Sequence, residues 1–256
     1  MILAVLATTL RAETPEGFDA TKHYHLGFSA AGAYIGIWHL NNDVYVKKEN
    51  SETETDEGLE KEHYEQYLSG GHDFKGLGFS FGISGMRDLG EKLALHINLY
   101  ISLRHRFVNA TEHHWRETEY YKDDELDHTS YKDGSKGNYD IVLNYWNLDL
   151  PLGIRYKAPR GYFIEIGGLF AYILSANLKV DLISLDFHSY TAGVELGVYT
   201  TAGKTFPLPG NRVLELYWNF TFGLTPLLND RVAKYLYDEI RPREWLAQAG
   251  ATLWLF

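Results

Sequence analysis

The residues that decide the fold are Asn144–Asn177, NYWNLDLPLGIRYKAPRGYFIEIGGLFAYILSAN, in which large apolar side chains recur at every second position. Along Trp146–Tyr156 they alternate with Asn, Asp, Pro, Gly and Arg, and the alternation resumes along Tyr162–Leu174. A period of two indicates a β-strand with one apolar and one polar face. The interruption at Ala158–Gly161 contains Pro and Gly, so the stretch predicts two strands joined by a tight turn.

The two faces of this hairpin differ in an unusual way. The apolar row holds the largest side chains, with Trp and Tyr near its ends, whereas the other row mixes charged residues with glycine. An apolar band bounded by aromatic residues suits a strand whose outer face meets lipid and whose inner face lines a crowded interior. The hairpin therefore predicts part of a transmembrane β-barrel.

The run Leu148–Lys157 (LDLPLGIRYK), followed by Tyr162–Gly168 (YFIEIGG), resembles the hairpin motif of the PorT-like outer-membrane β-barrel proteins. The rest of the chain agrees with that family in architecture. The resemblance implies a small eight-stranded barrel in the bacterial outer membrane, with a role in a secretion or surface-assembly system.

Period-two alternation elsewhere predicts an all-β, eight-stranded antiparallel up-and-down transmembrane β-barrel. The expected strands are His23–His39, Phe74–Arg87, Leu93–Phe107, Trp146–Tyr156, Tyr162–Leu174, Ala192–Tyr199, Leu214–Leu224 and Glu244–Phe256. Long and short connections alternate, as expected when short turns face the periplasm and long loops face outward. In the last strand, two rows compete for the outer face.

The chain is expected to be one barrel domain over residues 13–256, preceded by a leader. Residues 1–12, MILAVLATTLRA, predict a secretory signal peptide without a basic start, with a short buried strand as the alternative. The absence of cysteine excludes disulfides and cysteine nucleophiles. No run of about 18 apolar residues is present, which excludes a transmembrane helix.

The formal net charge of −10 comes from two polar segments that are predicted to be extracellular loops. Residues 41–72 carry nine acidic residues against three lysines, and residues 108–137 carry eight against four basic residues. Such loops can simply keep the surface hydrated, or they can bind a cationic ligand or an extracellular or envelope protein. The negative charge argues against nucleic acid as a partner.

The predicted strand faces assign residues to the barrel interior and to the lipid. Inward charges are expected to pair across a filled lumen, because isolated buried charges are costly. A narrow ion path along them is the alternative. The expected lumen network is Arg104, Arg106, Asp149, Arg155, Glu165, Glu195 and Glu215. The expected lipid-facing residues are Leu95, Leu99, Trp146, Leu150, Ile166, Phe170, Trp218 and Phe220.

Three further functions compete with a structural or interaction role. A soluble lipocalin-like barrel would place the apolar rows inside, and periodicity alone cannot separate inside from outside. An outer-membrane lipid-modifying enzyme would need a Ser–His pair, for which the candidates are Ser102, His105, His188 and Ser189. Clustered histidines could hold a transition metal, the candidates being His63, His72, His113, His114 and His128. No catalytic residue and no cofactor or metal is expected.

Overall fold

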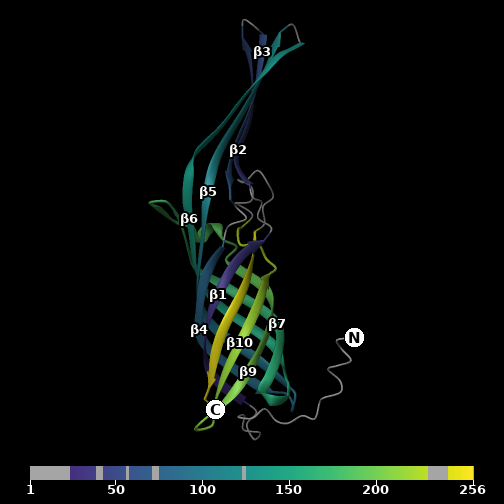
Figure 1. The fold of residues 1–256 in the computed structure, drawn as a ribbon, viewed down its shortest axis with the longest axis vertical. Coiled ribbons are helices and arrows are strands. Elements are labelled where there is room, and N and C mark those ends of the chain that lie inside the picture. Colours follow the sequence, from purple (N-terminus) through teal and green to yellow (C-terminus); the bar gives the residue numbers. More distant parts are fainter. Residues whose placement is uncertain are drawn as a thin grey trace.

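A computed structural model describes residues 24–38, 43–55, 58–70, 75–122, 125–229 and 242–255. These residues form eleven β-strands and two short 3-10 helices (Figure 1). The strands are β1 (Tyr24–Trp38), β2 (Asp43–Thr55), β3 (Gly58–Ser69), β4 (Lys75–Asp88), β5 (Leu93–Lys122), β6 (Glu125–Lys157), β7 (Tyr162–Val180), β8 (Ile183–Asp186), β9 (Val194–Leu208), β10 (Arg212–Gly223) and β11 (Arg243–Trp254). The 3-10 helices are η2 (Pro159–Gly161) and η3 (His188–Tyr190). The predicted signal peptide lies outside the described residues.

Eight of these strands pair into a closed antiparallel ring, in the order β1-β4-β5-β6-β7-β9-β10-β11. The pairing of β1 with β11, from Gly27 opposite Trp254 to Trp38 opposite Arg243, closes the ring. Closure leaves no unpaired sheet edge in the barrel, which a lipid environment requires because it offers the backbone no hydrogen-bond partner. Within the described residues, no helix is long and apolar enough to cross a membrane.

The prediction of eight strands is wrong in number, because much of the two acidic segments is strand rather than loop. β2 and β3 lie within residues 41–72, and β5 and β6 extend far past the barrel through residues 108–137. A further strand, β8, adds to the end of β7. The ring is therefore uneven, with strands of 12 to 33 residues.

The strand extensions form a second structure that we call the stalk, a four-stranded sheet in the order β2-β3-β5-β6 that projects from one end of the barrel (Figure 1). The stalk comprises β2, β3, residues 108–122 of β5 and residues 125–140 of β6. Ion pairs across its strands join Lys48 with Glu65 at 3.4 Å and Arg116 with Glu62 at 2.9 Å. Such pairs support a sheet that has little apolar surface to bury.

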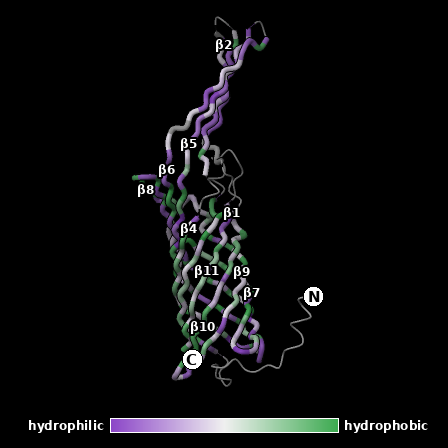
Figure 2. The backbone as a smooth tube through the Cα atoms, in the orientation of Figure 1, coloured by the Kyte–Doolittle hydropathy of each residue, from purple (hydrophilic) through white to green (hydrophobic). Residues whose placement is uncertain are grey.

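The ring turns its apolar rows outward and its polar rows inward. On β5, for example, Leu95 and Leu99 are exposed, whereas His96, Asn98 and Arg104 are buried. On β11, the ambiguous last strand, Leu246 and Trp254 point inward. Figure 2 shows the apolar residues concentrated in the barrel and the hydrophilic ones in the stalk.

The connections at the other end of the barrel are short. β6 and β7 are joined through η2, where Arg160 has a φ of 61° and Gly161 a φ of 78°. β9 and β10 are joined at Pro209–Asn211, where Gly210 has a φ of 78°. Positive φ is readily adopted by glycine, which explains a glycine in each turn. β11 also ends on this side, opposite the stalk (Figure 1).

Candidate functional site

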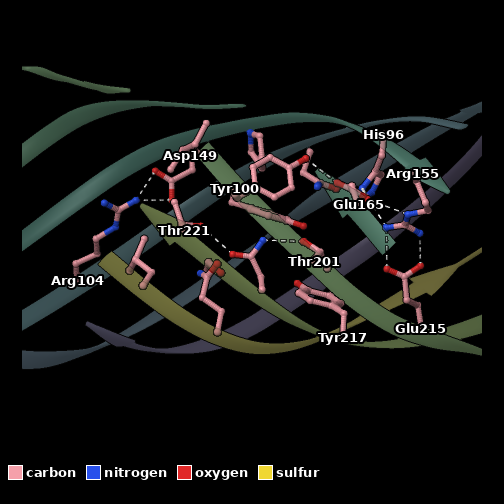
Figure 3. A pocket seen from close by; sticks show the side chains of 18 residues that line it. His96, Tyr100, Arg104, Asp149, Arg155, Glu165, Thr201, Glu215, Tyr217 and Thr221 are labelled. Atoms are coloured by element: carbon pink, nitrogen blue, oxygen red, sulfur yellow. Dashed lines mark hydrogen bonds and ion pairs between the residues drawn. The ribbon is translucent and has the colours of Figure 1, made fainter. Parts of the chain in front are cut away.

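The barrel interior contains two clusters of buried ion pairs. All seven residues predicted for the lumen lie inside the ring, each at most 6% exposed. The residues are Arg104, Arg106, Asp149, Arg155, Glu165, Glu195 and Glu215. They separate into two groups, one around Arg104 and one around Arg155 (Figure 3).

The first cluster is centred on Arg104 of β5, whose guanidinium reaches three other strands. It donates to both carboxylate oxygens of Asp149 at 3.0 Å, to Glu195 at 2.6 Å and to Glu244 at 2.5 Å. Asp149 also accepts a hydrogen bond from Ser102 at 2.6 Å. A single side chain thus joins β5 to β6, β9 and β11 across the ring. Arg106 lies two residues further along β5 on the same face. It pairs with Oε2 of Glu244, whereas Arg104 pairs with Oε1.

The second cluster is centred on Arg155 of β6. Its Nε donates to Glu165 of β7 at 2.9 Å, and its two terminal nitrogens donate to the two oxygens of Glu215 of β10 at 2.5 and 3.1 Å. Bidentate pairs of this kind are the strongest of the charge-assisted hydrogen bonds. Tyr199 donates to the other oxygen of Glu165 at 2.6 Å, and Trp254 donates to Glu215 at 3.1 Å.

A cavity of about 40 Å³ separates the two clusters. Tyr100, Thr201 and Tyr217 lie between the clusters in Figure 3. Two buried polar atoms of lining residues, His96 Nε2 and Asn98 Oδ1, have no hydrogen-bond partner among the described residues. The cavity has room for only about three water molecules at 10–15 Å³ each. Around this cavity, the barrel interior is packed with buried side chains.

Sequence reasoning missed two members of these clusters. Glu244 is fully buried and pairs with both Arg104 and Arg106, but it begins a strand whose two rows could not be told apart. His96 places Nδ1 at 2.8 Å from Glu165. Its place on the inward row of Leu93–Phe107, opposite a row of leucines and isoleucines, was the signal that could have identified it.

We expect the Arg155–Glu165 pair to be energetically coupled. In a double-mutant cycle of Arg155→Met and Glu165→Gln, the coupling free energy should be about 0.5–3 kcal/mol, because the two side chains share a buried hydrogen bond. The measurement is the free energy of unfolding of the four proteins in urea. A parallel cycle of Glu165→Gln with Arg104→Met should give a smaller coupling, since Arg104 belongs to the other cluster. Equal coupling in both cycles would contradict the division into two clusters.

The residues predicted to face lipid lie on the outside of the ring. Seven of them are 37–72% exposed, namely Leu95, Leu99, Trp146, Leu150, Ile166, Phe170 and Trp218. Phe220 also lies on the outward row, but it is partly buried and its ring stacks on Trp245 with 5.8 Å between centroids. Together these residues form an apolar exterior around the charged interior.

The candidate Ser–His pair is not brought together. Ser102 points into the barrel and donates to Asp149, whereas His105 points outward with Nδ1 at 2.7 Å from Asn144. His188 and Ser189 lie in η3, beyond the end of β8. An odd and an even position on one strand face opposite sides, so Ser102 and His105 cannot act on one substrate atom.

The histidines predicted as metal candidates lie on different faces of the stalk. His63 and His113 lie on one face, and His114 and His128 on the other, because residues in register across the sheet share a face. His72 lies outside the described residues. In the part of the chain that the structure describes, no group of three or more His, Asp or Glu could hold a metal ion.

The stalk has its own polar centre at Glu112 of β5. Its carboxylate accepts a hydrogen bond from Tyr139 at 2.8 Å and another from Gln66, and His114 lies beside it. Burial raises the pKa of Glu112, but these hydrogen bonds and the nearby histidine outweigh that effect and hold the pKa below its ordinary value. Hydrogen bonding to Glu112 in turn raises the pKa of Tyr139. The carboxylate therefore stays ionised and ties β5 to β3 and β6.

Comparison with known proteins gives similarity in structure only. No family model matches the chain, and no curated protein matches it. Among solved structures, Neisserial surface protein A (NspA) is similar with 14% identity and a TM-score of 0.33, over 90% of this chain and 96% of that one. The translocator domain of the autotransporter NalP from Neisseria meningitidis is similar with 9% identity and a TM-score of 0.25, over 94% and 91%. A Pseudomonas aeruginosa FadL homologue is similar with 9% identity and a TM-score of 0.23, over 91% and 89%.

Proposed function

We propose that the protein is an integral β-barrel of a bacterial outer membrane, and that the barrel anchors the stalk at the cell surface for recognition. The observation that carries this proposal is the inside-out distribution of side chains. Apolar residues face outward around a closed ring, while five carboxylates and three guanidiniums are buried within it. A lipid environment favours this arrangement, and water on both sides of the wall would not.

The other functions considered require different geometry. A soluble lipocalin-like barrel needs an apolar interior, whereas this interior is charged and nearly full. An ion path needs a continuous wet lumen, and the clusters around Arg104 and Arg155 cross it at two levels. A hydrolase needs a Ser–His pair, and Ser102 and His105 face opposite sides. We therefore propose an anchoring and binding role without catalysis.

The stalk is the part of the molecule suited to recognition. Outer-membrane barrels place short turns on the periplasmic side and long segments outside, so the stalk would project from the cell. Binding residues commonly sit on segments held by a rigid scaffold. The resemblance to PorT-like proteins suggests that the recognition serves secretion or surface assembly, through the segments 41–72 and 108–137.

The class of protein can be tested by folding the purified chain with and without detergent. We expect a strand-dominated circular dichroism spectrum only in detergent or lipid, and faster migration of the unboiled than of the boiled protein on a denaturing gel, because a closed barrel resists the denaturant. We also expect no ion conductance in a planar bilayer. A chain that folds in plain buffer would refute the proposed membrane barrel, and steady conductance would refute the filled lumen.

A further inference from the structure

One face of the stalk continues the outer surface of the barrel, because the outward residues of β5 have odd numbers along the whole strand. On this face Trp115 lies opposite Glu65 of β3 and Asp133 of β6. The next row toward the tip places Glu117 between His63 and Tyr131. Within the described residues, the extensive contacts of the stalk strands are with strands of the same sheet and of the adjoining barrel wall. No strand of the described residues forms a second layer over this face.

Ring side chains cluster at the centre of this face. The ring of Trp115 lies 5.4 Å from that of His63 and 6.4 Å from that of Tyr131, between centroids. One row closer to the barrel, Tyr67 and His113 stack at 5.0 Å. We call these five residues, together with Glu117 and Asp133 on the same face, the Trp115 face. Tyr131 is 66% exposed and the other four rings are partly exposed. A group of partly exposed rings on a polar sheet is a marker of an interaction surface.

Carboxylates accompany the rings. Glu117 accepts a hydrogen bond from the Tyr131 hydroxyl, which raises the pKa of that tyrosine. Asp133 is in register with Trp115. Both carboxylates therefore lie beside rings that present their π surfaces, a combination that attracts a cation electrostatically from two sides.

At two other places on the stalk the chain completes this combination with its own cations, once on the same sheet face, in the row of Glu119, and once on the opposite face. Lys61 lies 5.1 Å from the ring centre of Tyr121 and 3.4 Å from Glu52. Arg116 lies 5.9 Å from the ring centre of Tyr64 and 2.9 Å from Glu62. Each places a cation between a ring and a carboxylate.

The centre of the Trp115 face has the same rings and carboxylates without a cation between them. The lysine in the row of Trp115, Lys48, pairs with Glu65 at 3.4 Å. Among the described residues, no Lys or Arg lies over Trp115 or Tyr131, and none pairs with Glu117 or Asp133. The two segments that form the stalk also carry the whole net charge of −10, so a cation from outside is attracted to it.

We propose that the Trp115 face is a docking site for arginine- or lysine-rich segments of a partner polypeptide. A guanidinium would stack on Trp115 or Tyr131 and pair with Glu117 or Asp133, completing the arrangement that Arg116 makes with Tyr64 and Glu62. Arginine suits the site best, because its planar guanidinium stacks on rings and is weakly hydrated. This inference rests on the proposed function, in that the stalk must be outside the membrane to meet a partner.

The test uses the full-length chain in detergent micelles and a fluorescent oligo-arginine peptide, with binding followed by fluorescence anisotropy. Trp115→Ala should weaken binding about tenfold or more, as expected for a tryptophan at the centre of an interface. The matched control is Tyr120→Ala, which removes a ring from the opposite face and should change the affinity less than about twofold. A glycine–serine peptide of equal length should not bind.

A second pair of variants separates a site from general attraction by charge. Glu117→Gln and Glu60→Gln each remove one negative charge, but Glu60 is in register with Tyr120 on the opposite face. Only Glu117→Gln should weaken binding substantially. Equal losses from both variants, with no effect of Trp115→Ala, would overturn the proposal. Binding of a neutral oligosaccharide that depends on Trp115, with no peptide binding, would also overturn it and indicate a carbohydrate platform.

The outcome of the peptide-binding test can be told apart from the outcome of the test for a membrane barrel. Each variant is first checked for the heat-dependent gel shift, so that a loss of binding is not a loss of folding. If the chain folds in buffer yet binds the peptide through Trp115, the membrane proposal fails and the docking site stands. If the gel shift is present and the peptide does not bind, the membrane proposal stands and the docking site is refuted.

Discussion

Replacing Arg104 with Met is expected to lower the free energy of unfolding by about 3–5 kcal/mol, the cost of breaking a buried ion pair from one side. Arg104 is 2% exposed, and its guanidinium holds carboxylates from three other strands. Without it, Asp149, Glu195 and Glu244 face one another in a nearly dry interior, with only Arg106 left beside Glu244. Like charges at such distances cannot all remain ionised without a large penalty.

This expectation is measured by urea unfolding of the protein in lipid vesicles, followed by tryptophan fluorescence. Arg212→Met is the control, because Arg212 is exposed near a turn. This substitution should change the free energy of unfolding by no more than about 0.5 kcal/mol. Adding Glu195→Gln to the Arg104 variant should recover part of the lost stability by removing one unpaired carboxylate. If Arg104→Met lowers the free energy of unfolding no more than Arg212→Met does, the cluster does not hold the ring together.

Replacing Leu150 with Arg is expected to cost about 2–4 kcal/mol, the penalty for arginine on the lipid face near the bilayer midplane. Leu150 is 37% exposed on the outer row of β6, between the aromatic residues Trp146 and Tyr156. Its side chain contacts no aqueous phase if the barrel is embedded, so the charge must distort the bilayer or lose its hydration.

The control for this change is Leu93→Arg at the start of β5, beside a short turn. Leu93 is similarly exposed, but a residue near the membrane interface should cost only about 0–1 kcal/mol. Both free energies come from reversible unfolding in vesicles. Equal and small effects at the two positions would mean that the outer row of β6 meets water.

Sequence patterns predicted the barrel wall well where one face of a strand is apolar. The strand that ends at Tyr156 is apolar on one side only, so a period of two is visible without knowing the partners. The stalk was missed for the opposite reason. Its strands carry charged and polar residues on both faces, and their pairing depends on backbone ladders continued from the barrel and on pairs such as Arg116 with Glu62, which no local pattern shows.

The interior was predictable as a set of residues but not as a set of contacts. Alternation indicates that Arg155 and Glu165 point inward, whereas the association of Glu215 with Arg155 depends on how the ring closes. Glu244 was missed because β11 carries apolar residues on both rows, and only its register against β1 and β10 assigns Leu246 and Trp254 to the inside.

The central claim, that a lipid-embedded barrel carries the stalk outside the cell, is tested most directly by labelling single cysteines in intact Gram-negative cells. The chain has no cysteine of its own, so each introduced thiol reports one position. The positions are Tyr131 in the stalk, Ile166 on the outer wall, and Gly90 in the β4–β5 turn, where an added Cβ meets no atom within 4 Å.

With a membrane-impermeant maleimide, we predict that Tyr131→Cys reacts in intact cells, that Gly90→Cys reacts only after the outer membrane is permeabilised, and that Ile166→Cys reacts only after the protein is denatured. Ready labelling of Ile166→Cys in the folded protein would contradict the lipid-facing wall. Protection of Tyr131→Cys together with labelling of Gly90→Cys in intact cells would contradict the surface location of the stalk.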